Sequence, residues 1–78
     1  MTDTVRLNTL KPGDKCLIME IKATGITGQR LMDLGLIPRV VIEVVRNAPL
    51  VDPVQLLVRD NHISIRHSEA REIGVILL

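Results

Sequence analysis

The fold of this chain is decided by the stretch Arg30-Leu31-Met32-Asp33-Leu34-Gly35-Leu36-Ile37-Pro38. Leu31 and Leu34 lie three residues apart, which is the spacing of one face of a helix. Gly35 follows directly and suits the left-handed position that ends many helices, because it has no Cβ. The stretch therefore predicts a short helix over residues 28–34 and a sharp stop after it.

The segments on either side of this stretch predict strands. Pro38 cannot continue a helix, and the apolar run Val40 to Arg46 that follows predicts a strand. Before the stretch, Thr27 is the expected N-cap of the helix. Cys16 to Ile21 predicts a longer strand, but apolar residues do not alternate strictly there, so either both faces are partly covered or a bulge shifts the register.

The C-terminal half contains the clearest hairpin. Residues 54–59 and 62–66 alternate between apolar and polar side chains, and Asp60-Asn61 between them is the expected two-residue turn. The side chains expected to point inward are Val54, Leu56, Val58, Ile63 and Ile65. A polar lead-in or short edge strand over residues 2–9, a turn at residues 10–14, one helical turn over 69–72 capped by Ser68, and a strand over 73–78 complete the pattern.

These elements predict a mainly β protein. The expected fold is a small SH3-like barrel of about five strands with one or two short helices, formed as a single domain over residues 1–78. At 46% hydrophobic residues the chain is not expected to be disordered. It contains no Phe, Tyr or Trp, so its core must be aliphatic.

Composition also limits the class of partner. The formal net charge is +1, and basic and acidic residues are interspersed, so neither nucleic acid nor an anionic membrane is expected to bind. Single-stranded nucleic acid and proline-rich peptides are usually held on aromatic side chains, which this chain lacks. A single cysteine, no signal peptide and no apolar run long enough to span a bilayer indicate a cytoplasmic protein without direct membrane insertion.

The sequence offers no clear chemical centre. The metal-ligand candidates are Cys16, His62 and His67, which are expected to be a buried apolar residue and two surface histidines. Ser64 and Ser68 have neighbouring histidines but no nucleophile elbow or orienting acid, and no phosphate-binding glycine loop is present. We therefore expect no metal site, no cofactor and no enzymatic activity.

Four motifs occur in the order and spacing of a known family. They are Leu10-x-Pro12-Gly13-Asp14, Arg30-Leu31-x-x-Leu34-Gly35-Leu36-x-Pro38, Ala48-Pro49-Leu50-x-Asp52-Pro53 and Ile65-Arg66-x-x-Glu69-Ala70-x-x-Ile73-x-Val75. Together they span residues 10–75, and the chain resembles the ferrous iron transport protein A family. The motif positions with an expected structural role are Gly13, Arg30, Gly35, Pro38, Arg66 and Glu69. Arg39 and Val51 stand where the family usually has glycine.

The resemblance implies a function that the residues alone do not. Members of the family are small SH3-like cytosolic proteins that are accessory to a large membrane ferrous iron transporter with a cytosolic G-protein domain. The same domain occurs at the C-terminus of iron- and manganese-dependent repressors. An adaptor of the transporter is the leading interpretation. A free-standing domain that acts on a metal-dependent repressor and a small metal-binding or iron-sensing protein are the alternatives.

Partner contacts are expected from two places. The first is the proline loop, defined here as residues 47–53, in which two prolines reduce the freedom of the backbone. The loop residues expected to contact the partner are Pro49, Leu50, Asp52 and Pro53, and the predicted helix adds Leu31 and Leu34. The second is the outer face of the strands, where unshielded apolar side chains would favour an interaction site or a homo-oligomer. Those side chains are Leu17, Met19, Val41, Val45 and Leu57.

Overall fold

The computed structural model describes residues 3–78 of the chain. Within them are six strands: β1 (Val5–Arg6), β2 (Lys15–Ile21), β3 (Val41–Arg46), β4 (Val54–Val58), β5 (Asn61–Ile65) and β6 (Ile73–Leu77). The helices of the same part are η1 (Leu7–Thr9, a 3-10 turn), α1 (Gly25–Asp33) and α2 (His67–Ala70). The strands pair antiparallel in the order β1-β6-β2-β3-β4-β5. The mainly β prediction is confirmed, with the two-residue edge strand β1 added to the expected five.

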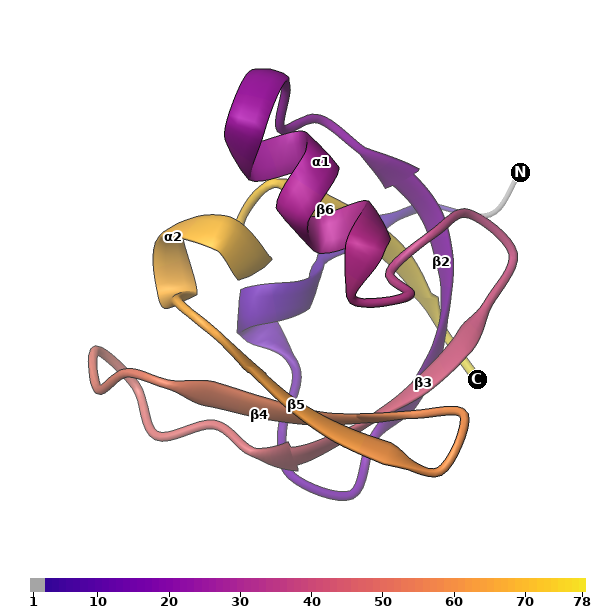
Figure 1. Cartoon of the computed structure of the whole chain (residues 1–78). Helices are drawn as coiled ribbons and strands as arrows, with labels where there is room; N and C mark the ends of the chain where they lie inside the picture. The colour runs from indigo at the N-terminus through magenta and orange to yellow at the C-terminus, as the bar shows by residue number, and fades with distance from the viewer. Residues whose placement is uncertain (1–2) are drawn as a thin grey trace.

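The sheet curls round on itself (Figure 1), and its buried core side chains are aliphatic apart from Cys16. The inward side chains of the β4–β5 hairpin are buried as predicted, with Ile63 only partly so. One core residue is not predicted by the sequence pattern. Leu7 lies in η1 and is fully buried, although the segment around it was expected to be a polar lead-in or edge strand.

Helix α1 ends as the sequence predicts. Gly35 has φ +94°, its N–H donates to the carbonyl of Met32 at 2.9 Å, and the N–H of Leu36 donates to the carbonyl of Leu31 at 3.1 Å. This pair of bonds is the Schellman motif, in which an apolar residue after the glycine packs back onto the helix. Leu31 and Leu36 are both fully buried, so the helix end is also part of the core.

The start of α1 differs from the prediction. The helix begins at Gly25, with Thr24 as its N-cap in place of Thr27. The N–H of Gly28 already donates to the carbonyl of Thr24 at 3.2 Å, so the first helical turn closes one turn earlier. The hydroxyl of Thr24 makes no capping hydrogen bond, so this helix start lacks the side-chain interaction by which N-caps are usually predicted.

Two strand details also depend on local geometry. The register between β2 and β6 shifts between Ile18 and Glu20, which confirms the bulge offered as one explanation for the irregular alternation. The β4–β5 turn is formed by Arg59 and Asp60, both at positive φ, and so lies one residue earlier than the predicted Asp60-Asn61 turn. Val58 pairs with Asn61, and this register keeps the apolar side chains of both strands on the inner face of the sheet. Burial of these side chains, and not the preference of the turn residues, therefore decides the register.

Helix α2 also starts earlier than predicted. It begins at His67 with Arg66 as N-cap, whereas the sequence suggested Ser68 as the cap. The carboxylate of Glu69 accepts a hydrogen bond from the N–H of Arg66 at 2.8 Å. An arginine side chain has no acceptor to return the bond, so only half of a capping box forms.

The chain uses the same proline turn more than once. In residues 11–14 and 37–40 a proline occupies the second position, and the N–H of the fourth residue donates to the carbonyl of the first. The third residues are Gly13 at φ +93° and Arg39 at φ +73°, as in a type II turn. Arg39 stands where the family usually has glycine, and its N–H donates to the carbonyl of Ile18 at 2.7 Å, which connects the turn to β2.

Replacement of Gly35 by valine should destabilise the domain. A β-branched residue fits poorly at φ +94°, although the nearest atom to a new Cβ is a methyl of Val58 at an ordinary 3.5 Å. We expect a loss of about 1 kcal/mol or more in the free energy of unfolding, measured by urea titration. An unchanged unfolding midpoint would contradict the left-handed geometry at this position.

Replacement of Arg39 by glycine should have the opposite effect. The left-handed conformation is unfavourable for arginine by roughly 1–2 kcal/mol, while glycine loses roughly 0.5–1 kcal/mol of extra chain entropy. We therefore expect a net stabilisation of about 0.5–1 kcal/mol and a melting temperature a few degrees higher. A lower melting temperature would show that the exposed Arg39 side chain makes a stabilising contact that outweighs the strain.

Candidate functional site

The proline loop contains a third turn of the same kind. Pro49 occupies its second position, and the N–H of Val51 donates to the carbonyl of Ala48 at 3.1 Å. Leu50 occupies the third position with φ +62°, where glycine is usually required. Its side chain is 96% exposed. A large apolar residue therefore stands at the tip of the loop in a backbone conformation that glycine would adopt more easily.

Leu50 gains nothing from this placement within the domain. The left-handed backbone is unfavourable by roughly 1–2 kcal/mol, and an exposed leucine contributes no burial to offset it. Strained backbone of this kind is concentrated at functional sites. The family's glycine position falls at Val51, which lies outside the positive-φ residues, so valine there does not strain the turn.

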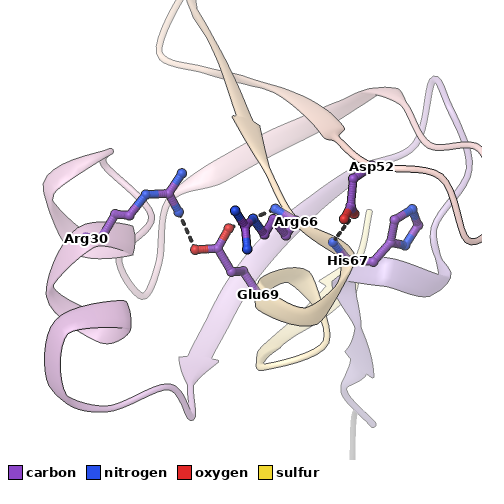
Figure 2. Close-up of polar contacts among 5 residues, drawn as sticks. All are labelled: Arg30, Asp52, Arg66, His67 and Glu69. Atoms are coloured by element: carbon purple, nitrogen blue, oxygen red, sulfur yellow. Dashed lines mark hydrogen bonds and ion pairs between the residues drawn. The ribbon is translucent and has the colours of Figure 1, made fainter.

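His67 holds the proline loop against α2. Its Nε2 lies 3.0 Å from the carbonyl oxygen of Ala48 and 2.9 Å from that of Val51. Because both neighbours are acceptors, Nε2 carries the proton. The backbone N–H of His67 also donates to Oδ1 of Asp52 at 2.8 Å (Figure 2). His67 is thus a structural residue of the loop, which corrects the expectation of a solvated surface histidine.

Asn47 fastens the base of the same loop. Its Nδ2 donates to the carbonyls of Asn8 at 3.0 Å and Leu10 at 2.7 Å, which ties the loop to η1 and the segment after it. No sequence pattern predicts this role for Asn47, and the only local signal is an amide directly before Ala48-Pro49. The loop is therefore anchored at its base by Asn47 and near its tip by His67.

The family motif residues form a second cluster beside the loop. Arg30 of α1 forms an ion pair with Glu69 of α2, and the two side chains point toward each other in Figure 2. The side chain of Glu69 is only 12% exposed, and its other oxygen accepts the N–H of Arg66. Three residues that the sequence grouped only by motif are thus brought together, and they join α1 to α2.

Of the two contacts predicted from α1, the one at Leu31 is wrong, and the one at Leu34 stays a prediction. Leu31 is fully buried, and Leu34 is partly buried and packs against the core. Both side chains lie on the inward face of the helix because they share the spacing that predicted it. Leu31 therefore cannot contact a partner directly, whereas Pro49, Asp52 and Pro53 are exposed in the proline loop.

The outer sheet face is only partly open. Val41 is 50% exposed and Val45 37% exposed, whereas Leu17, Met19 and Leu57 are partly covered. Leu17 and Val41 are direct cross-strand neighbours, so each shields part of the other. This face is less prominent than the tip of the proline loop.

The metal-ligand candidates lie in different parts of the fold. Cys16 is fully buried in the core, His62 is exposed on β5, and His67 bonds to the proline loop. Within residues 3–78, no three His, Cys, Asp or Glu side chains gather as a metal site would require. The arrangement gives no chemical centre, and the expectation of no metal binding stays a prediction.

The FeoA domain family matches residues 5–77 of the chain. The chain belongs to the FeoA family. It is 34% identical over 74 residues to a Fe(2+) transport protein A/Fe(2+) transporter FeoB fusion protein of Porphyromonas gingivalis (strain ATCC BAA-308 / W83). That match covers 95% of this chain and 9% of the much longer fusion protein.

Solved structures show the same FeoA architecture. A crystal structure of an iron uptake regulatory protein (FeoA) has a TM-score of 0.90 at 28% identity, covering 96% of this chain and 99% of the other. The zinc complex of Stenotrophomonas maltophilia FeoA, a prokaryotic SH3 domain protein, has a TM-score of 0.80 at 21% identity over 91% and 88% of the two chains. The SH3-like fold is thereby confirmed.

Family membership places the chain in ferrous iron transport as an accessory domain that is not an enzyme. Both conclusions agree with the sequence analysis. None of the helices within residues 3–78 is long and apolar enough to cross a bilayer.

Cys16 gives a test of the core. Burial, and after it the negative charge of Asp14, raises the pKa of the Cys16 thiol from 9.0 to about 11. The unfolded chain ionises at the ordinary pKa, so the folded state should lose stability as the pH rises from about 9 to 11 and be unaffected by this group below pH 9. Urea titrations should show a smaller loss over this range for Cys16→Ala, and equal losses in both proteins would contradict burial of the thiol.

Proposed function

We propose that this FeoA-family chain is a cytoplasmic adaptor that binds and regulates the cytosolic G-protein domain of a membrane ferrous iron transporter of the FeoB type. The observation that carries the proposal is Leu50, 96% exposed and held at φ +62° on a proline turn. Contiguous exposed apolar side chains mark interaction sites, and Leu50 lies between the exposed Pro49 and Val51. The natural fusion of the two proteins in Porphyromonas gingivalis supports this choice of partner.

The ordered proline loop would favour binding of the transporter domain in two ways. Hydrogen bonds from Asn47 and His67 order the loop before the partner arrives, so less conformational entropy is lost on docking. Burial of Leu50 against the partner would then contribute roughly 1.5–3 kcal/mol. The neighbouring Pro49 and Val51 are also exposed and would enlarge the contact.

The fusion also suggests how strong the contact needs to be. In one chain the two parts are always close, so the effective concentration is high and a weak interface is sufficient. A preordered loop raises the affinity of such a contact whether or not the two parts share one chain. We therefore place the main contact at the tip of the proline loop.

The test is replacement of Leu50 by glycine. Glycine is better suited to the left-handed position, so the variant should keep or slightly raise its melting temperature. It should also bind the purified cytosolic domain of the transporter at least tenfold more weakly, since a loss of roughly 1.5–3 kcal/mol exceeds the 1.4 kcal/mol of a tenfold change. Isothermal titration calorimetry and ferrous iron uptake in cells measure the two effects.

Arg39→Gly is the matched control, because it makes the same backbone change in another proline turn. It should bind and support uptake normally. Normal binding by Leu50→Gly would exclude Leu50 as the contact. Equal loss in both variants would mean that the change in the turns, and not the leucine side chain, is responsible.

A further inference from the structure

A groove of about 660 Å³ is lined by the start of α1 and by α2. In Figure 2 two of its lining residues, Arg30 and Glu69, lie on the opposite side of Arg66 from His67 and Asp52. It is mostly polar, and its lining residues are Lys22, Ala23, Thr24, Thr27, Arg30, Arg66, Ser68, Glu69 and Glu72. Arg30, Arg66 and Glu69 are family motif positions for which only a structural role is expected, and the proposed contact at Leu50 does not use the groove. Its charges and donors indicate what would bind there.

Two of the charged groups are already satisfied. Arg30 and Glu69 neutralise each other in their ion pair, and the second oxygen of Glu69 accepts the N–H of Arg66. Glu69 is also largely buried, so it offers little negative charge to a ligand. Both residues of the ion pair line the groove, and the pair joins α1 to α2.

The remaining charges are mainly positive. Within residues 3–78 the guanidinium of Arg66 makes no ion pair, and Lys22 only approaches Glu20 at 3.9 Å where both side chains are more than half exposed. Such an exposed pair contributes little and is easily exchanged. Glu72 is the one carboxylate of the lining outside the Arg30–Glu69 pair, so Lys22 and Arg66 leave an excess of one positive charge.

The neutral groups of the lining add donors. Thr24, Thr27 and Ser68 also line the groove and carry hydroxyls, and the Thr24 hydroxyl is not used to cap α1. A guanidinium and an ammonium offer only donors, and hydroxyls can turn to donate. A carboxylate is the protein group that best complements such a set, with Arg66 able to bind both of its oxygens.

We propose that this groove binds an acidic segment of the transporter's cytosolic domain, with Arg66 and Lys22 contacting an Asp or Glu side chain. The inference rests on the proposed function. Arg66 and His67 are neighbours at the start of α2, and in Figure 2 they extend to opposite sides, Arg66 toward Glu69 and His67 beside Asp52. A partner that covers Leu50 and crosses α2 therefore reaches the groove and forms one continuous interface.

The test uses charge reversal and the purified cytosolic domain of the transporter. Arg66→Glu and Lys22→Glu should each weaken binding about tenfold, with a weaker salt dependence than the wild-type complex shows. Arg59→Glu is the matched control, because Arg59 is exposed at the far end of β4 from the proline loop and should bind within about twofold of wild type. Arg66→Gln, which removes the charge but keeps a shorter polar side chain, guards against an effect of the introduced glutamate on folding and should still lose most of the affinity.

The outcomes separate this inference from the proposed function. If Leu50→Gly weakens binding and Arg66→Glu and Lys22→Glu do not, the groove is not a contact and the adaptor function stands. If the wild-type protein does not bind the transporter domain, both proposals fail. If inorganic phosphate alone shifts the amide resonances of Thr24, Thr27 and Ser68 while the charge reversals leave transporter binding unchanged, the groove is a small-anion site and the acidic-segment inference is overturned.

Discussion

The hydrogen bond from the N–H of Leu36 to the carbonyl of Leu31 is the interaction on which the rest of the fold depends. It reverses the chain at Gly35 and puts two leucines into the core from one short stretch. The reversal also places Pro38 and Arg39 beside β2. There the N–H of Arg39 donates to the carbonyl of Ile18, next to the point where β2 begins to pair with β3. In a chain without aromatic residues, this double insertion of leucine is an efficient way to fill the centre.

The recurrence of one turn shows how strain is distributed. Gly13, Arg39 and Leu50 occupy equivalent positions in three proline turns, and all have positive φ. Gly13 adopts this geometry without penalty, and Arg39 is held by a backbone bond to β2. Leu50 is held because His67 contacts the carbonyls of Ala48 and Val51, the first and last residues of its turn. Backbone strain is therefore tolerated where a neighbouring element fixes the turn. At Leu50 the strained turn leaves an apolar side chain exposed to solvent.

The two sides of α2 have different chemistry. On one side His67 and Asp52 order a loop with an apolar tip, and on the other the Arg30–Glu69 pair borders a groove with excess positive charge. A helix of only four residues can connect both because each side is fixed by a side chain from a distant segment. An apolar contact for affinity beside a charged contact for orientation is a common division within one protein interface.

The sequence by itself determined the features that depend on neighbouring residues. The end of α1 at Gly35, the alternating hairpin strands, the aliphatic core and the family motifs all follow from local spacing and composition. The sequence placed three features wrongly. The two helices start earlier than predicted, at Gly25 and His67, and the hairpin turn lies at Arg59-Asp60. Capping and register at these places are set by hydrogen bonds that local residue preferences do not reveal. Only the tertiary structure decided that His67 orders the proline loop and that Arg30 meets Glu69, since these partners lie 16, 19 and 39 residues apart. Contacts over such separations depend on how the sheet curls, and no local pattern encodes that geometry.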